Sequence, residues 1–204
     1  MYELLKALQN GEVVVYPTET LYAIGCDATN AAACQKVIDI KGRSGAKPLP
    51  LIIGGLDMLD LVTDEKPAAL AHLAESFWPG PLSILVKALP ELPASLSDDE
   101  GYTSVRWSGH AFASELSRRL KKPIVSTSAN ISGNPPVALP DAVDPELIAQ
   151  VGASYFDPPW PRGGKASTVV RLLGSTRLKI IREGAVSVKM LCDKGFSVTL
   201  SKAV

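Results

Sequence analysis

Short runs of apolar residues alternate along this chain with segments whose apolar residues recur at helical spacing. The short runs have the length and the β-branched content of buried strands, and they cover residues 12–16, 49–53, 82–87, 103–107, 123–128, 154–156, 167–173 and 178–182. The helical spacing predicts helices over residues 4–8, 31–40, 67–77, 111–120 and 141–151, with a short one near 186–192. Asn30 is placed to cap the second of these helices.

Helices and strands are interspersed without a strict strand-helix-strand rhythm. This order predicts an α/β fold in which three layers form around a mixed, twisted open sheet, and not a purely parallel doubly wound sheet. The sharpest break is the proline-rich stretch 157–164, which is typical of a surface loop because two strand-like runs follow it. A chain of 204 residues fits one substantial domain, so we predict a single domain over residues 1–204.

The composition is that of an ordinary globular protein, with 46% apolar and 21% charged residues. Because the formal net charge is zero, no global field draws the chain onto nucleic acid or membrane. A local basic patch over residues 41–47 is still expected. No apolar run reaches the roughly 18 residues of a membrane span, and the first residues do not resemble a signal peptide, so we expect a cytoplasmic protein.

The three cysteines are Cys26, Cys34 and Cys192. Their odd number and their spacing fit neither a disulfide framework nor a zinc site. We therefore expect all three to be reduced, small residues of the core.

Polar clusters stand at the ends of the predicted strands. Residues 17–20 (Pro-Thr-Glu-Thr) follow the first strand, Arg106 lies near the end of another, and residues 126–130 (Ser-Thr-Ser-Ala-Asn) lie at the end of a third. The basic segment 41–47 precedes the strand that starts at residue 49. Cations and hydroxyls that recur at strand ends predict one convergent site for an anionic ligand, and phosphate in particular.

Several of these residues also have plainer explanations. Lys41 suits the C-terminus of its helix, although that does not account for Arg43 or Lys47 in the loop beyond it. Arg106 is either paired with a core carboxylate or aimed at a ligand carboxylate. Arg182, at another strand end, is either a ligand contact or part of a surface pair with its neighbour. No Walker A loop, catalytic triad, zinc set or pair of catalytic carboxylates is present in the sequence.

Taken together, the motifs resemble those of the YrdC family. The matching segments appear in family order over a core of about residues 5–188, and they are residues 16–22, 41–43 with 47–49, 78–82, 105–106, 126–133, 167–170 and 182–184. The chain differs from the usual family pattern at Ala23, where glycine is frequent, and at Ile52 or Ile53, where many members carry histidine. The resemblance implies a YrdC-like fold and the short form of the family.

The resemblance also implies an activity, that of an L-threonylcarbamoyladenylate synthase. Such an enzyme is a nucleotidyltransferase that converts L-threonine, bicarbonate or CO2, and ATP into threonylcarbamoyl-AMP and pyrophosphate. The product serves the N6-threonylcarbamoyladenosine modification of tRNAs that read ANN codons. Mg2+ should accompany ATP, with no metal site built from protein ligands. Proteins that transfer the threonylcarbamoyl group to tRNA are the expected partners, together with weakly bound tRNA itself.

Matching positions assign roles to individual residues. The residues implied to contact threonine are Thr20, Arg106, Ser126 and Ser167. The residues implied to bind ATP are Lys41, Arg43, Lys47, Ser128, Asn130 and Arg182, with Lys41 and Arg43 as the catalytic pair. Positioning and electrostatic stabilisation suffice for this chemistry, because no covalent enzyme intermediate is needed.

Three other functions stay open from the sequence. The first is a non-enzymatic RNA-binding protein of the same fold, acting in tRNA or ribosome maturation through shape and phosphate contacts. The second is a paralogue that has lost or changed the synthase activity. The third is a structural subunit of a modification complex. Pyrophosphate release that depends on threonine distinguishes the synthase from the first and third of these.

Overall fold

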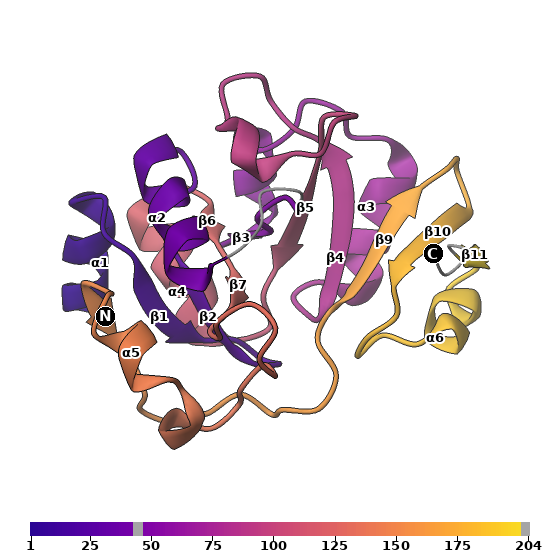
Figure 1. Cartoon of the computed structure of the whole chain (residues 1–204). Coiled ribbons are helices and arrows are strands. Elements are labelled where there is room, and N and C mark those ends of the chain that lie inside the picture. The colour runs from indigo at the N-terminus through magenta and orange to yellow at the C-terminus, as the bar shows by residue number, and fades with distance from the viewer. Residues whose placement is uncertain (43–46, 201–204) are drawn as a thin grey trace.

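A computed structural model describes residues 1–42 and 47–200 as a mixed α/β structure with twisted sheets, which confirms the predicted fold class (Figure 1). Its helices are α1 (Tyr2–Gln9), α2 (Ala31–Lys41), α3 (Ala68–Phe77), α4 (Ala111–Leu120), α5 (Pro145–Ile148) and α6 (Val188–Asp193). Its strands are β1 (Val14–Pro17), β2 (Tyr22–Gly25), β3 (Leu51–Ile53), β4 (Leu82–Lys87), β5 (Tyr102–Trp107), β6 (Ile124–Val125), β7 (Thr127–Ser128), β8 (Ala153–Ser154), β9 (Thr168–Leu172), β10 (Arg177–Arg182) and β11 (Ser197–Leu200).

Within the described residues, hydrogen bonding divides these strands between two sheets. The smaller sheet has the order β7-β2-β1-β8, and the larger has the order β11-β10-β9-β4-β5-β3-β6. Both sheets are mixed: β1 is antiparallel to β2 but parallel to β8, and β4 is antiparallel to β5 but parallel to β9. The division into two sheets leaves room for a cavity between their facing edges.

Local sequence signals explain where the helices begin and end. The side chain of Asn30 accepts a hydrogen bond from the backbone N–H of Ala33 at 3.1 Å, which confirms the predicted cap of α2. The same helix stops at Gly42, whose φ of 57° is in the left-handed region that glycine adopts readily. The cap and the stop together set the position of Lys41, the last residue of the helix.

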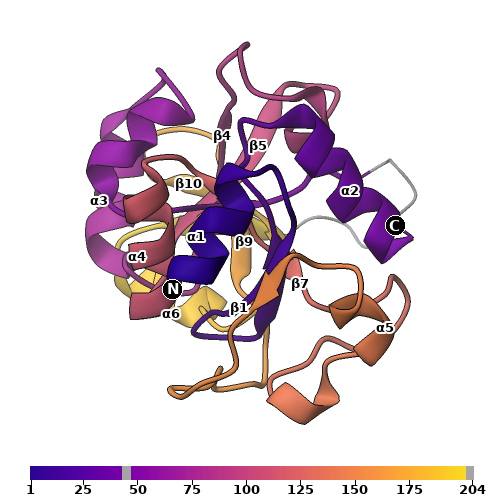
Figure 2. The ribbon, with the colours of Figure 1, turned by 90° about the vertical axis from the view of Figure 1, so that its left-hand side faces the viewer.

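Two hydrophobic clusters hold the layers together. In one, residues of α1 and α4 join buried residues of both sheets, among them Val14 of β1 and Ile52 of β3. The ribbons of α1 and α4 lie on the same side of the molecule (Figure 2). In the other, Leu73 of α3 joins Ile84 of β4 and Leu178 of β10 in a single buried group. One face of the larger sheet thus packs against α3, and its other face borders the cavity.

The predicted strand over residues 123–128 is divided between the two sheets. Its first part, β6, pairs with β3 in the larger sheet, and its second part, β7, pairs with β2 in the smaller sheet. At this crossing the hydroxyl of Tyr16 donates a hydrogen bond to the carbonyl of Val125 at 2.8 Å, and the backbone N–H of Val125 bonds to the carbonyl of Cys26 at 2.9 Å. The crossing leaves Ser126 between the sheets.

The structure corrects other predictions. The helix predicted over 141–151 is a 3₁₀ turn followed by the short α5, because Pro145 disfavours helical geometry at the residue before it. Asp144 instead caps α5 by accepting a hydrogen bond from the N–H of Glu146 at 2.9 Å. The strands β2 and β11 were not predicted from the sequence. Cys26 and Cys34 are buried as expected, but Cys192 is exposed.

Close approach of the two sheets makes Gly25 sensitive to substitution. A Cβ atom at this position would lie 1.7 Å from the carbonyl oxygen of Val125. We expect Gly25→Ala to lower the free energy of unfolding by about 3 kcal/mol, because the backbone at the crossing must move. Denaturant unfolding with Gly174→Ala as a matched control measures this, since the nearest atom to a Cβ at Gly174 is 3.9 Å away. Equal midpoints for the two variants would contradict the expectation.

Candidate functional site

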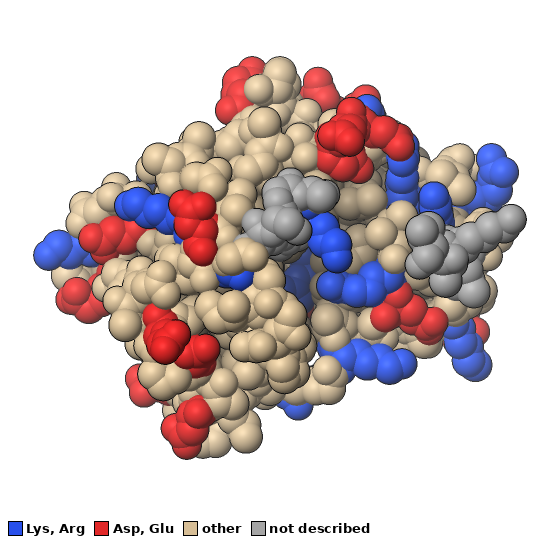
Figure 3. All heavy atoms as spheres, in the orientation of Figure 1, with Lys and Arg blue, Asp and Glu red and all other residues tan. Residues whose placement is uncertain are grey.

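A cavity of about 600 Å³ lies between the two sheets. On the face that shows it, lysine and arginine side chains gather around a hollow near the middle of the molecule (Figure 3). The residues predicted from the sequence to bind ligand that line this cavity are Thr20, Lys47, Arg106, Ser126, Ser128, Ser167 and Arg182. The structure therefore brings the residues expected to contact threonine together with most of those expected to contact ATP.

The turn between β1 and β2 presents two threonine hydroxyls at one end of the cavity. The hydroxyl of Thr18 donates to the carbonyl of Leu21 at 2.7 Å and accepts the N–H of Thr20 at 3.3 Å. The hydroxyls of Thr18 and Thr20 lie 3.2 Å apart. This hydrogen-bonded turn fixes the direction of Thr20, which is 7% exposed and faces the cavity.

Arg106 is paired with a carboxylate of the protein and also lines the cavity. Its Nη1 lies 2.5 Å from Oε1 of Glu19, and the two side chains are only 7% and 13% exposed. The other carboxylate oxygen of Glu19 accepts a hydrogen bond from the hydroxyl of Ser108. Arg106 nevertheless lines the cavity, so a buried carboxylate orients a guanidinium that a ligand can reach.

Arg182 connects the two predicted groups of binding residues. Its Nε and Nη2 donate to the backbone carbonyl of Ser167 at 3.1 and 2.9 Å, and Nη2 also lies 3.2 Å from the Ser167 hydroxyl. That hydroxyl lies 3.1 Å from the hydroxyl of Ser83. The register of β9 with β10 shifts between Ile180 and Arg182, a local irregularity that re-aims the side chain at the end of β10.

The positive charge of Arg106 affects the pKa of Arg182. Desolvation within the cavity lowers the pKa of Arg182, and the nearby positive charge of Arg106 lowers it further. The guanidinium of Arg182 remains charged at neutral pH because arginine starts from so high a pKa. Two cations that face one cavity form a favourable place for an anion.

Lys41 occupies a different position from the other predicted residues. It is 3% exposed, and its Nζ donates to the backbone carbonyls of Ser128 and Asn130, the latter at 2.7 Å. Neither Lys41 nor Asn130 is among the residues that line the cavity, but Ser128 is. Arg43 lies outside the described residues. The observed contacts of Lys41 hold the loop that carries Ser128 and Asn130.

Asn130 is also held by this loop. Its side-chain nitrogen donates to the carbonyls of Ile131 and Asn134 at 3.0 and 2.7 Å. The backbone N–H of Ser132 in turn bonds to the carbonyl of Lys41 at 2.8 Å. The loop and the end of α2 thus form one hydrogen-bonded unit beside the cavity.

Sequence reasoning assigned no binding role to Ser83, Ser104 or Tyr22, yet all three line the cavity. The hydroxyls of Ser104 and Tyr22 are buried without a hydrogen-bond partner among the described residues. Burial raises the pKa of Tyr22, and the charge of Asp157 raises it further. The alternation of residues along a strand could have found Ser104, because it shares a face of β5 with Arg106.

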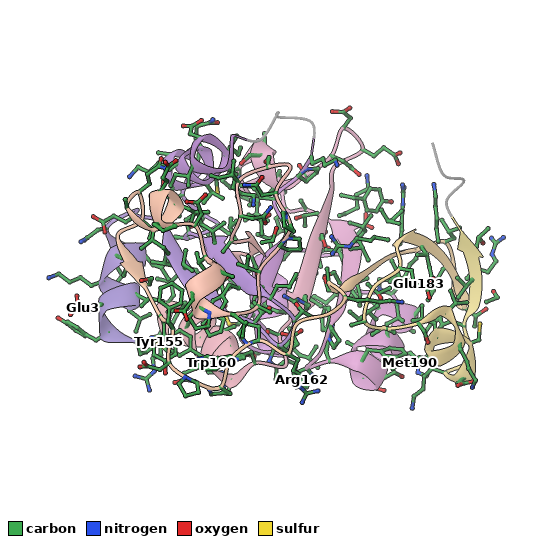
Figure 4. All side chains as sticks on the ribbon, turned by 60° about the horizontal axis from the view of Figure 1, so that its bottom comes forward. Glu3, Tyr155, Trp160, Arg162, Glu183 and Met190 are labelled. Carbon is green, nitrogen blue, oxygen red and sulfur yellow. The ribbon has the colours of Figure 1, made fainter. Side chains whose placement is uncertain are left out.

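A loop at the lower edge of the molecule crosses from the smaller sheet to the larger one (Figure 4). The loop bears Trp160 and Arg162, and it lies against the β1–β2 turn. The backbone N–H of Arg162 bonds to the carbonyl of Glu19 at 3.3 Å, and that of Gly163 bonds to the carbonyl of Thr20 at 2.9 Å. The loop therefore fixes the backbone at two residues of the site.

The described part of the chain contains no group of three or more histidine, cysteine, aspartate or glutamate side chains arranged to hold a metal ion. The donors that face the cavity are mainly cations, hydroxyls and backbone groups, which suit oxyanions better than bare metal ions. In residues 1–42 and 47–200, no helix is both long and apolar enough to span a membrane.

Comparison with known proteins identifies the family. The family model for Sua5, YciO and YrdC, which carries the description "Telomere recombination", matches residues 6–184. The chain therefore belongs to the Sua5/YciO/YrdC family. It is 35% identical over 168 residues to a protein of Xylella fastidiosa named threonylcarbamoyl-AMP synthase, covering 80% of this chain and 87% of that protein.

Solved structures agree with this assignment. The fold superimposes on Sua5 of P. abyssi in complex with L-threonine with a TM-score of 0.90 and 26% identity, covering 97% of this chain. The H234A/Y235A variant of the same protein gives a TM-score of 0.91 and 26% identity, again over 97% of this chain. This chain spans only 58% and 60% of the length of those two structures, so it matches part of the Sua5 chain.

The contacts of Lys41 lead to a test that separates support of the loop from direct ligand contact. We expect Lys41→Met to lower the free energy of unfolding by about 1–3 kcal/mol, because two backbone carbonyls lose their charged donor. Thermal unfolding measures the change, and Lys36→Met is the control on the same helix. Lys36 donates to one carbonyl, that of Gly11 at 2.9 Å, and is exposed. An unchanged melting temperature for Lys41→Met would show that the loop does not depend on Lys41.

Proposed function

We propose that this protein is an L-threonylcarbamoyladenylate synthase, acting as a nucleotidyltransferase. The observation that carries the proposal is that Arg106 and Thr20 line the same cavity as Arg182, Lys47 and Ser128. The relatives named threonylcarbamoyl-AMP synthase and the Sua5 complex with L-threonine support it. We infer further that residues 1–204 form one domain, with a core of about residues 5–188.

The proposed reaction joins three substrates. The amine of L-threonine adds CO2 derived from bicarbonate to give a carbamate and water. A carbamate oxygen then attacks the α-phosphorus of ATP, and the bond from that phosphorus to the β-phosphate oxygen breaks. The products are threonylcarbamoyl-AMP and pyrophosphate, whose charge must be stabilised as it leaves.

Each wall of the cavity contributes a different part of this task. Arg106 would bind the threonine carboxylate, and Thr20, Ser126 and Ser167 would contact the rest of the amino acid. Arg182, Lys47 and Ser128 would bind the nucleotide phosphates, together with Asn130, which lies beside the cavity and is not among its lining residues. In this arrangement the amine of threonine would lie next to the phosphate chain, and holding two reactants in that orientation is itself catalytic.

The two residues of the catalytic pair differ in how far the structure supports their roles. Lys41 would act by holding the Ser128–Asn130 loop in place, since its Nζ bonds to the carbonyls of both residues. Direct contact of Lys41 with phosphate stays a prediction. Arg43 would stabilise the charge of the triphosphate from the adjoining segment, a role that rests on the family motif.

The substrate would be the magnesium complex of ATP. The Mg2+ ion would be held by phosphate oxygens and water. In the cell, the product would pass to the proteins that transfer the threonylcarbamoyl group to tRNA. A location in the cytoplasm, where tRNA and ATP are found, fits this role.

Pyrophosphate release tests the proposal. Purified protein with ATP, Mg2+, bicarbonate and L-threonine is expected to release pyrophosphate, and omission of either threonine or bicarbonate should abolish the release. Both dependences are expected because the carbamate, and not water, is the nucleophile. An assay coupled to inorganic pyrophosphatase, which does not act on ATP, measures the product as phosphate. Folded protein that binds RNA but releases no pyrophosphate would favour the RNA-binding alternative and contradict the synthase.

Arg43→Ala tests the role of the basic segment. The substitution is expected to raise the KM for ATP or lower kcat by about 100-fold or more, because one charge-assisted contact to the transferring phosphate chain is lost. The melting temperature should stay within about 2 °C of the wild type, because the proposed role of Arg43 is contact with ligand and not support of the fold. Full activity of the variant would remove Arg43 from the site, and a large loss of thermal stability would assign it a structural role.

A further inference from the structure

Arg106 and Arg182 border the same cavity but differ in how their charge is balanced. Arg106 forms a buried ion pair with Glu19 at 2.5 Å. The described residues contain no ion pair that includes Arg182, which donates instead to the carbonyl and hydroxyl of Ser167. The charge of Arg106 is therefore partly offset by a carboxylate of the protein, whereas that of Arg182 has no such partner among the described residues.

Glu19 is held firmly in its place. One carboxylate oxygen contacts Arg106 and the other accepts a hydrogen bond from the hydroxyl of Ser108, which is 1% exposed. The backbone carbonyl of Glu19 accepts the N–H of Arg162 at 3.3 Å. Two side chains thus fix the carboxylate of Glu19, and the loop that bears Arg162 fixes the backbone of its turn. This carboxylate therefore holds the guanidinium of Arg106 in one orientation.

The difference in charge has a consequence for ligand choice. A fully charged arginine in a desolvated cavity attracts a multiply charged phosphate more strongly than a carboxylate, since the Coulomb energy grows with ligand charge. An arginine whose charge is already offset loses most of this long-range preference. It can still donate its remaining N–H groups to a carboxylate in a directed hydrogen bond.

We propose that Glu19 is a positioning and specificity-determining residue that sorts the two anionic substrates between the two arginines. It holds Arg106 in the orientation that binds the carboxylate of the amino acid, and it offsets the charge of Arg106 so that phosphate groups bind at Arg182 instead. This inference rests on the proposed function, because it takes the amino acid and the nucleotide as the two ligands of the cavity.

The opposite role for Glu19 predicts the opposite result. If Glu19 competed with the incoming carboxylate for Arg106, its removal would tighten the binding of the amino acid. If Glu19 positions Arg106, its removal weakens that binding. The sign of the change in affinity therefore decides between the two roles.

The experiment is calorimetric titration of L-threonine into wild-type and Glu19→Gln protein, each with and without an excess of inorganic phosphate. In the variant we expect the Kd for threonine to rise at least about tenfold, because Arg106 loses its fixed partner. Phosphate should compete with threonine in the variant but not in the wild type. Neither measurement depends on catalytic turnover.

Two further variants separate geometry from charge. Glu19→Asp keeps the charge but shortens the side chain, so it should weaken threonine binding while phosphate still fails to compete. Ser108→Ala removes the second partner of Glu19 and should weaken threonine binding less than Glu19→Gln does. If Glu19→Gln fails to fold, Ser108→Ala still tests whether the position of Glu19 affects threonine binding. Glu115→Gln is the matched control, because Glu115 pairs with Arg119 at 2.7 Å on the exposed face of α4.

Threonine binding by Glu19→Gln that equals or exceeds that of the wild type would overturn the inference. Equal competition by phosphate in the wild type and in Glu19→Gln would also overturn it. Failure of the proposed function gives a different pattern, in which wild-type protein neither binds threonine nor releases pyrophosphate.

Discussion

The crossing of the chain from one sheet to the other at residues 124–128 is the constraint on which the site depends. Val125 receives a hydrogen bond from Tyr16 and approaches Gly25 so closely that no side chain fits there. Ser126 lies between the two strands, with its backbone N–H bonded to the carbonyl of Pro50 at 2.8 Å. Two residues later, Ser128 faces the cavity. The contact that joins the sheets thus also sets the width of the cavity between them.

Charge within the cavity is distributed unevenly between the two sheets. The larger sheet supplies both Arg106 and Arg182, on strands β5 and β10, and the smaller sheet supplies the hydroxyl-rich β1–β2 turn. The only carboxylate paired with these arginines among the described residues comes from that turn, as Glu19. A loss of contact between the sheets would therefore separate Arg106 from its counter-ion and disturb ligand binding as well as stability.

Much of this could be predicted from the sequence, because periodicity and strand-end chemistry are local signals. The predicted residues Thr20, Arg106, Ser167 and Arg182 do line one cavity. The pairing of Glu19 with Arg106 could not be predicted, because it joins positions far apart in the chain whose meeting depends on the tertiary fold.

The division of residues 123–128 between two sheets was missed for a similar reason. A run of apolar residues followed by hydroxyls indicates a strand but does not say which partner each part pairs with. The helix predicted over 141–151 is wrong for a local reason, because Pro145 disfavours helical geometry at Asp144 and starts a separate helix.

The order in which the walls appear along the chain has a consequence for synthesis. The central strand β4 pairs with β9 in a parallel register, Leu82 with Thr168, so a long stretch of chain separates the partners. During translation one edge of β4 stays unpaired until β9 has emerged from the ribosome. Such non-local pairing slows folding. Because Ser167 precedes β9 directly and Arg182 ends β10, a nascent chain can complete neither the pairing of β4 nor its anion-binding wall until residues up to 182 have been made.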